Sequence, residues 1–285
     1  LFYCQKVGWE GNRMMRFCRK IGYYVWSAIQ LLIGVKNWDV LFAIFFAKPF
    51  TGLKWLKLRR NNLNMAVTSK MEAWSVKESL IDRFYTRYSE TIQADWTIVD
   101  IGASIGEFTV EAALQVPEGK VYAFEPNPGS INILRQNVRA NELKNIETHT
   151  IGVWKETGEI TLEIRPEDPI HGRSYDGEIP SDAVHKRTTI PVVSLREMFE
   201  TIVVENVDLL KMDTEGTEFD ILMNEAPETF EKVHRIIMEV HESSPDRTLE
   251  QMIERLNLLG YKTEHYPNKA HAHMSYLYAW RSEKI

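Results

Sequence analysis

Short apolar runs alternate with amphipathic segments along most of the chain. Residues 97–101 read Thr-Ile-Val-Asp-Ile, which is typical of a buried strand, and a turn containing Gly102 and Gly106 follows. Apolar residues then recur at helical spacing from Phe108 to Leu114. A strand, a glycine-rich turn and a helix in this order are typical of the first unit of a doubly wound α/β domain.

The same rhythm continues to the end of the chain and predicts the remaining elements. Further strands are expected over 120–125, 146–151, 207–213 and 235–240, and helices over 75–88, 128–138, 218–224 and 249–259. Ser75 and Glu78 form the capping-box pattern that sets the start of the first of these helices. Residues 261–266 and 274–280 alternate apolar and polar side chains, which predicts an antiparallel hairpin. The predicted fold class is therefore α/β, with a doubly wound, mostly parallel seven-stranded sheet and a C-terminal antiparallel hairpin over residues 71–285.

Residues 153–191 lie between the third and fourth predicted strands and are polar and rich in turn-forming residues. They contain Pro166, Pro169, Gly172, Gly177 and Pro180. A plain crossover between two strands needs fewer residues, and long insertions in compact domains usually carry a function. We therefore expect this insertion to form a substrate lid.

Residues 1–70 form a basic, aromatic segment ahead of the predicted sheet. They carry 12 Lys/Arg and two acidic residues, a formal charge of +10, whereas residues 71–285 carry −16. The apolar stretch over 21–50 is interrupted by Gln30 and by the polar cluster over 36–39, so neither half supplies the roughly 20 apolar residues of a membrane span. Two alternatives remain for this segment. It forms two short helices that pack on the body, or a helical arm that binds anionic membrane through residues 16–60.

The composition excludes several classes of protein and site. The two cysteines, Cys4 and Cys18, exclude a disulfide scaffold and a four-cysteine zinc site. The acidic body argues against a nucleic-acid partner, since phosphate binding needs a basic face near the chemistry. Met14, Met15 and Arg16 look like a natural start, so residues 1–13 are excluded from the prediction of the fold. No small-residue cleavage site follows the apolar stretch, and we expect a cytoplasmic protein with the membrane contact as the open alternative.

Polar side chains stand at the carboxyl ends of four predicted strands. They occupy the segments from Asp100 to Gly106, from Glu125 to Asn127, from Asp213 to Glu215 and from Glu239 to His241. Open parallel sheets bind their ligands beyond the carboxyl ends of the strands, near the point where the strand order reverses. The convergence of these segments predicts a functional site at this edge of the sheet.

The residues alone allow three interpretations of the segment from Gly102 to Gly106. As a G-x-S-x-G motif it would make Ser104 the nucleophile of a hydrolase, but that motif belongs well inside the sheet order and not after the first strand. A dinucleotide fingerprint requires a third glycine, and the chain has Glu107 at that position. The third interpretation is a glycine turn that serves only tight packing.

Several ordered segments resemble one known family. Residues 99–109, Val-Asp-Ile-Gly-Ala-Ser-Ile-Gly-Glu-Phe-Thr, resemble the first motif of class I, Rossmann-like methyltransferases that use S-adenosyl-L-methionine, and closely resemble that of the FkbM family. Residues 123–128, Ala-Phe-Glu-Pro-Asn-Pro, are similar to the second motif of the family, and residues 208–218 contain its K-x-D-x-E-G signature. Residues 191–195 and 236–241 resemble the segments on either side of that signature.

The resemblance implies how S-adenosylmethionine is bound. Asp100 is expected to face the ammonium group of this cofactor, and Glu125 to accept hydrogen bonds from both ribose hydroxyls, because an ionised carboxylate is purely an acceptor. The glycines let the backbone approach the methionine half of the cofactor. The residues expected to bind the cofactor are Asp100, Gly102, Ser104, Gly106, Phe108, Glu125, Asn127, and Gly152 and Val153 in a loop on the adenine side.

The resemblance also implies methyl transfer to an acceptor oxygen, often a hydroxyl of a sugar, glycolipid or polyketide. A hydroxyl is a weak nucleophile until its proton is removed, so a positioned base is expected. The candidate catalytic residues are Lys211, Asp213, Glu215, Glu239 and His241. We expect Asp213 or His241 to touch the acceptor, and Lys211, which shares a strand face with Asp213, to orient that carboxylate.

Each of these residues also has a purely structural interpretation. Lys211 and Asp213 can form a buried ion pair between strand ends, Glu215 can satisfy a helix N-terminus, and His241 can cap a loop. At the level of function, an N-methyltransferase acting on protein or nucleic acid and a non-catalytic cofactor-binding module remain as alternatives.

No metal is expected in the site. The cluster around Asp213 can in principle hold magnesium, and His265, His271 and His273 form a second histidine group, but resemblance to this family does not imply a metal. The residues that select the acceptor are expected in the insertion and in the N-terminal arm.

Overall fold

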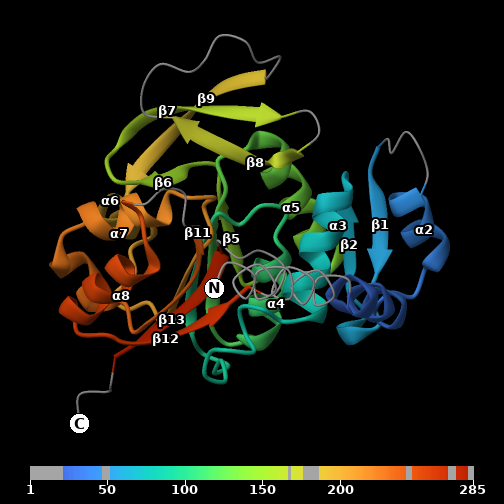
Figure 1. The fold of residues 1–285 in the computed structure, drawn as a ribbon, viewed down its shortest axis with the longest axis horizontal. Coiled ribbons are helices and arrows are strands. Elements are labelled where there is room, and N and C mark those ends of the chain that lie inside the picture. The colour runs from blue at the N-terminus through green and yellow to red at the C-terminus, as the bar shows by residue number, and fades with distance from the viewer. Residues whose placement is uncertain are drawn as a thin grey trace, which may run out of the picture.

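The structure is a computed structural model that describes residues 22–46, 52–165, 168–175, 186–241, 246–268 and 274–281. A central sheet of seven strands has the order β12-β13-β11-β10-β3-β4-β5 (Figure 1). Its strands are β3 (Thr97–Ile101), β4 (Lys120–Phe124), β5 (Ile146–His149), β10 (Leu209–Met212), β11 (Arg235–His241), β12 (Lys262–Pro267) and β13 (Met274–Trp280). All neighbours from β5 to β11 are parallel, and β13 is antiparallel to both β11 and β12. The predicted fold class is confirmed, including the C-terminal hairpin.

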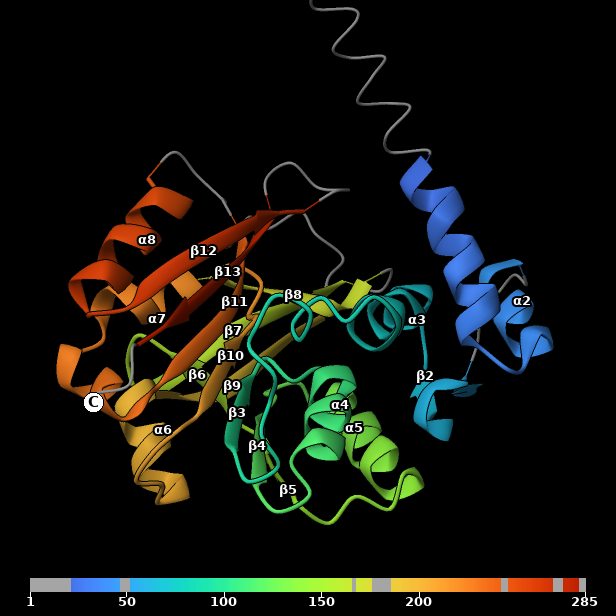
Figure 2. The ribbon, with the colours of Figure 1, turned by 90° about the horizontal axis from the view of Figure 1, so that it is seen from below.

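Helices cover both faces of the central sheet (Figure 2). One face carries α4 (Glu107–Gln115) and α5 (Pro128–Ala140), and the other carries α6 (Leu195–Ile202), α7 (Glu218–Asn224) and α8 (Leu249–Leu258). The start of α5 is as predicted, because the Asn127 side chain accepts a hydrogen bond from the Gly129 amide and Pro128 takes the first helical position. A capping box of Thr248 and Gln251 begins α8.

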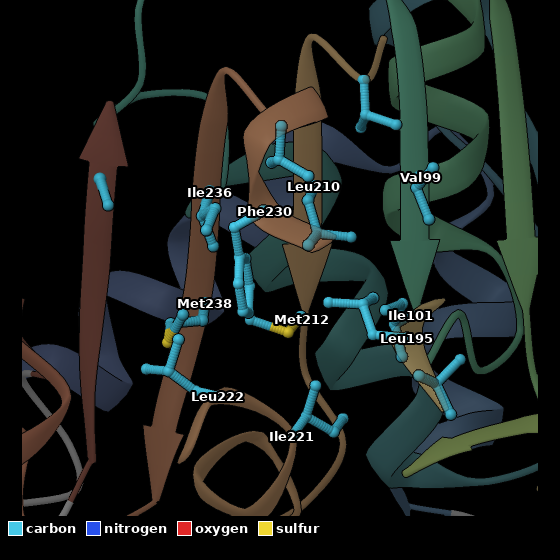
Figure 3. Close-up of a cluster of buried hydrophobic side chains, with 14 of the residues drawn as sticks. Val99, Ile101, Leu195, Leu210, Met212, Ile221, Leu222, Phe230, Ile236 and Met238 are labelled. Atoms are coloured by element: carbon cyan, nitrogen blue, oxygen red, sulfur yellow. The ribbon is translucent and has the colours of Figure 1, made fainter. Parts of the chain in front are cut away.

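The alternation of side chains along the strands separates the core into two halves. Val99, Ile101, Leu210 and Met212 point toward α6, α7 and α8, where Figure 3 shows them with Phe230 and Leu222. Burial of each such side chain contributes roughly 1.5–3 kcal/mol to stability. The intervening positions face α4, so the polar residues at positions 100, 211 and 239 share the side of the sheet that α4 covers.

The insertion is more regular than the sequence predicts. It contains a second sheet of order β6-β9-β7-β8, which lies at the end of the central sheet where β5 leads into β6 (Figure 1). Its strands are β6 (Gly152–Trp154), β7 (Gly158–Arg165), β8 (Asp168–Tyr175) and β9 (Lys186–Ser194). The sequence pattern predicted no strands in this insertion, because only a small core of Trp154, Ile160, Ile190 and Val192 marks them. Pro169 and Gly172 occur in β8, which is an edge strand and therefore tolerates proline.

The described part of the N-terminal arm packs on the body. Residues 22–34 are helical, and α2 (Trp38–Phe46) follows. A short hairpin of β1 (Lys54–Lys57) and β2 (Asn64–Val67), with a 3-10 turn over Arg60–Asn62, comes next and was not predicted. One apolar cluster joins the arm to α4 and α5, through Leu31, Val35, Leu41, Ile44, Leu56, Met65, Val110 and Ile133. The described residues contain no helix that has both the length and the apolar content to cross a membrane.

The first predicted helix begins earlier than expected. It comprises α3 (Lys70–Val76) and a π-helical turn, η2 (Lys77–Ile81), instead of residues 75–88. Ser69 caps it by accepting a hydrogen bond from the Glu72 amide, whereas the Ser75 hydroxyl donates to Glu107. The capping pattern was assigned to the wrong serine because Ser69 and Glu72 have the same spacing as Ser75 and Glu78.

Candidate active site

The carboxyl ends of β3, β10 and β11 bring the predicted polar residues together. Lys211 lies opposite Asp100 in the register of β10 and β3, and the Asp213 amide donates to the Ile101 carbonyl at 3.1 Å. β11 lies on the other side of β10 and carries Glu239 and ends at His241. Three segments that are far apart in the sequence therefore form one edge of the site.

Two glycines allow the turn after β3 to pack closely. Gly102 has φ +73°, and a Cβ atom there would lie 1.8 Å from the carbonyl oxygen of Asp213. Gly106 has φ +89°, and a Cβ atom there would lie 2.8 Å from Cγ of Leu134. Both glycines are therefore required by the packing of the chain itself, which is the structural interpretation of this turn, and their contact with the cofactor stays a prediction.

Replacing Gly102 with alanine should destabilise the protein by about 2–5 kcal/mol, because the strand ends must separate and the left-handed backbone becomes strained. Gly158→Ala is the matched control, since no atom of the described residues lies within 4 Å of a Cβ placed there. Urea unfolding of both variants measures the difference. Equal unfolding free energies of the two variants would show that the turn accommodates a Cβ atom at position 102 without loss of stability.

Glu125 is held at the end of β4 by two backbone amides. The Ser104 amide donates to its Oε2 and the Asn127 amide to its Oε1, both at 2.8 Å. Burial raises the pKa of Glu125 to about 7, against these hydrogen bonds and the charge of Lys211. Each carboxylate oxygen keeps a second lone pair for another donor. Next to it, Ser104 has φ +49° and its buried hydroxyl oxygen has no hydrogen-bond partner among the described residues.

Lys211 is paired with Asp100 and not with Asp213. Its ammonium lies 2.9 Å from Asp100 Oδ1 and donates to the Gly102 carbonyl at 2.8 Å, while the Thr109 hydroxyl donates to Asp100 Oδ2. Burial acts to lower the pKa of Lys211, but the charges of Asp100 and Asp213 raise it to about 12. The expectation that Lys211 orients Asp213 is therefore revised, because the register places Lys211 opposite Asp100. This pair holds two strand ends together.

Asp213 has one oxygen that is held by a hydrogen bond and one that is open. The Tyr85 hydroxyl donates to its Oδ2 at 2.6 Å, and its buried Oδ1 has no hydrogen-bond partner among the described residues. Burial and the charge of Asp213 raise the pKa of both Tyr85 and Glu239 well above their usual values. Tyr85 therefore keeps its proton at neutral pH.

His241 is surrounded by carboxylates. Its Nε2 lies 3.6 Å from Glu215 Oε2, and its Nδ1 lies 3.4 Å from Glu218 Oε1. Burial acts to lower the pKa of His241, but Glu218, Glu215 and Asp213 outweigh this effect and raise it to about 10. His241 is therefore an imidazolium at neutral pH, which disfavours the hypothesis that it is the general base.

The charge on His241 predicts a pH dependence of stability. Because its pKa is about 10 in the folded protein and 6.5 in the reference state, its contribution is complete below about pH 6.5 and is lost as the pH rises toward 10. The contribution is on the order of a few kcal/mol. We expect the difference in unfolding free energy between wild type and His241→Gln to shrink over this range, as measured by urea titrations. A difference that is independent of pH would contradict the raised pKa.

A cation also fits the chemistry of this cluster. Asp213, Glu239 and His241 each offer one ligand atom, and these atoms lie within 4.8 Å of one another. Binding would require His241, whose pKa is about 10, to lose the proton that it holds at neutral pH. In the second histidine group, His265 lies in β12, and His271 and His273 lie outside the described residues.

The remaining residues that were predicted to bind the cofactor are buried in the fold or make contacts within the protein itself. Phe108 is buried in α4 with its ring 5.5 Å from that of Tyr85, and the Asn127 side chain caps α5. Gly152 and Val153 are buried in β6, so the expected adenine-side loop is a strand. Asp100 is fully buried, and its expected contact with the ammonium group of the cofactor stays a prediction.

Sequence reasoning missed two residues of this site. Tyr85 reaches Asp213 from a segment 128 positions earlier, and no spacing in the sequence connects them. Glu218 is nearly fully buried and accepts hydrogen bonds from the Thr214 and Gly216 amides as well as approaching His241. The sequence signal that could have identified Glu218 was its position three residues after Glu215 in the acidic segment.

Comparison with known proteins gives a consistent result. The Methyltransferase FkbM domain matches residues 100–263, more than half of the chain. Methyltransferase sdnD of Sordaria araneosa is 27% identical over 225 residues, which cover 69% of this chain and 86% of sdnD. Hexuronic acid methyltransferase AglP of Haloferax volcanii is 24% identical over 195 residues, which cover 67% of this chain and 76% of AglP.

Two further comparisons involve proteins called FkbM. The 31-O-demethyl-FK506 methyltransferase FkbM of Streptomyces tacrolimicus is 22% identical over 191 residues, covering 58% of this chain and 73% of that protein. The crystal structure of Methyltransferase FkbM from Methylobacillus flagellatus has a TM-score of 0.46 and 17% identity, covering 73% of this chain and 53% of the other.

Proposed function

This chain belongs to the FkbM family of methyltransferases, and from this premise we propose that it transfers the methyl group of S-adenosylmethionine to a hydroxyl oxygen of a sugar, glycolipid or related small molecule. The methyltransferase fold implies S-adenosylmethionine as the donor. The names of two relatives support an oxygen acceptor, since one is a hexuronic acid methyltransferase and the other acts on a 31-O-demethyl compound.

The residues at the end of β3 and β4 fit the cofactor. Glu125 has one free lone pair on each oxygen after its two backbone amides are counted, which suits the two neighbouring hydroxyls of a ribose. The buried Ser104 hydroxyl lacks a partner in the described part of the chain and can bind a polar group of the same ligand. When bound, S-adenosylmethionine supplies a methyl group that is already activated by its sulfonium charge.

The observation that carries the proposal is that Oδ1 of Asp213 is buried and has no hydrogen-bond partner among the described residues. A hydroxyl that donates to this oxygen would have its proton withdrawn as it attacks, and Oδ1 is the atom that accepts the proton. The Tyr85 hydroxyl holds Oδ2 and so fixes the orientation of the carboxylate. Tyr85 and His241 keep their protons at neutral pH, and burial with the charge of Asp213 raises the pKa of Glu239, which favours Asp213 as the base among these neighbours.

The reaction is tested with a donor that carries a tritiated methyl group. The purified protein is incubated with this donor and with separate cell-envelope glycan and lipid extracts, in the presence and absence of a chelator. We expect transfer of label to a glycan or glycolipid fraction in both conditions, because no step requires a cation. Transfer that stops with the chelator and resumes with magnesium would favour a metal held by Asp213, Glu239 and His241.

The acceptor is expected to enter near the second sheet, because that sheet lies at the end of the central sheet where the site forms (Figure 1). Its role as a lid is part of the same proposal. A membrane contact through residues 16–60 is a separate proposal, since it rests on the N-terminal helices.

A further inference from the structure

The two N-terminal helices expose an unusually apolar outer face. We define this outer face by the exposed side chains of Tyr24, Val25, Trp26, Ile29, Ile33, Trp38, Phe42 and Phe46. Trp26 is 58% exposed, Ile33 65% and Phe46 77%. Elsewhere in the described part of the chain, exposed large apolar side chains occur singly, as at Val203 and Leu258. Large contiguous apolar patches on a protein surface usually mark a binding site.

The helix over 22–34 carries apolar side chains on the side that is exposed to solvent. Its outer side carries Val25, Ile29 and Ile33 at intervals of four residues, which place them in one row. Its inner side carries Ser27, which is fully buried, and Leu31. A surface helix of a globular protein normally has the opposite distribution.

The second helix repeats the arrangement with aromatic side chains. In α2, Trp38, Phe42 and Phe46 follow one another at intervals of four and are all exposed, and the rings of Phe42 and Phe46 are stacked at 5.8 Å. Leu41 and Ile44 are buried on the other side. The Trp38 indole donates to the Leu32 carbonyl at 2.8 Å, but packing on the body does not explain Phe42 and Phe46, because other residues of α2 make that contact.

Contacts with the body fix the position of these helices. The Lys77 ammonium donates to the Ser27 hydroxyl at 2.8 Å, and the Tyr23 hydroxyl donates to Glu78 at 2.9 Å. Figure 2 shows the two helices side by side at the margin of the molecule, away from the central sheet. These two hydrogen bonds hold the helix over 22–34 against the body.

The charges next to this face indicate the partner. Lys36, between the two helices, is exposed, and its backbone amide donates to the Lys57 carbonyl at 2.7 Å. The Arg59 amide donates to the Gly34 carbonyl at 2.8 Å, so two further exposed basic residues lie beside the same turn. Asp39 is the single acidic residue between positions 22 and 70, and residues 1–21 add more basic residues.

We propose that this outer face docks on the surface of an anionic lipid bilayer. Tryptophan and phenylalanine side chains enter the boundary between headgroups and acyl chains, while Lys36, Lys57 and Arg59 approach the lipid phosphates. The apolar rows match the acyl-chain boundary of such a surface, and the basic residues beside them match its anionic headgroups. The proposal stands independently of the acceptor and of the base, because none of these residues belongs to the candidate active site.

The test is flotation of the full chain with vesicles of phosphatidylcholine alone or mixed with phosphatidylglycerol. We expect binding to the mixed vesicles and release at high salt. The triple variant Trp26→Ser, Ile33→Ser, Phe46→Ser should bind at least about tenfold more weakly. Lys57→Gln with Arg59→Gln should weaken binding by about fivefold for each charge.

The control is the double variant Val203→Ser, Leu258→Ser, which removes exposed apolar side chains elsewhere and should bind like the wild type. Binding of S-adenosylhomocysteine by every variant shows that the domain is folded. Wild-type protein that ignores both vesicles, or a triple variant that binds them as well as wild type, would overturn the proposal. A dimer that dissociates in the triple variant, without vesicle binding by the wild type, would assign the face to a second copy of the chain.

Discussion

Replacing Asp213 with asparagine should lower the turnover rate by about 10²–10⁴-fold, which is the usual effect of removing a general base. The amide has the shape of the carboxylate and can still accept the hydrogen bond from Tyr85, but it cannot accept a proton from the acceptor hydroxyl. The affinity for S-adenosylhomocysteine should change little, because the cofactor-binding residues are elsewhere. Steady-state kinetics with the acceptor and calorimetry with S-adenosylhomocysteine measure the two effects separately.

Two further variants sharpen this test. Tyr85→Phe removes the hydrogen bond to Oδ2 and leaves the base in place, so we expect a smaller loss of turnover, about tenfold. Glu228→Gln changes an exposed acid in the 3-10 turn over Pro227–Lys232 and should leave the rate unchanged. If Asp213→Asn retains the wild-type rate, the base is another carboxylate of the cluster, Glu215 or Glu239.

Replacing Glu125 with alanine should weaken binding of S-adenosylhomocysteine by more than about 100-fold. Two ribose hydroxyls lose their acceptor, and hydrogen bonds to a charged group contribute about 1.5–3 kcal/mol each. The Ser104 and Asn127 amides lose their partner as well, which loosens the turn. Glu118→Ala, an exposed change just before β4, is the matched control. Unchanged affinity in Glu125→Ala would exclude the ribose assignment.

The pKa of Glu125 allows a second test of the ribose assignment. Its pKa is about 7, so the carboxylate loses an acceptor position below that pH and gains it above. We expect the wild-type affinity for S-adenosylhomocysteine to rise as the pH increases through 7, and that of Glu125→Gln to be lower and independent of pH in this range. A parallel response of both proteins would place the titrating group elsewhere.

The central sheet could be predicted from the sequence because its strands are short apolar runs that end in polar turns. Residues 97–101 and 235–241 are mostly buried on both faces, so they read as runs of branched apolar residues broken only by the polar positions near their ends. The second sheet could not be predicted in this way. Its small core leaves most side chains of β7 and β9 polar, and proline and glycine inside β8 indicate turns in the sequence.

The sequence predicted which strand ends meet at the candidate site, but not the pairings of their side chains. Strand ends at the same edge brought Asp213, Glu239 and His241 together, as the order of the motifs required. The choice of Asp100 as the partner of Lys211 depends on the register between β3 and β10, which no local pattern encodes. The charge on His241 depends on Glu218, the first residue of α7, whose carboxylate lies next to the imidazole.

The most direct test of the central claim is to identify the atom that receives the methyl group. S-adenosylmethionine with a carbon-13 methyl is incubated with the acceptor found in the screen, and the product is examined by NMR. The chemistry of Asp213 predicts a methyl carbon bound to oxygen, formed by the wild type and lost in Asp213→Asn. A methyl carbon bound to nitrogen, or an O-methyl product formed equally by Asp213→Asn, would contradict it.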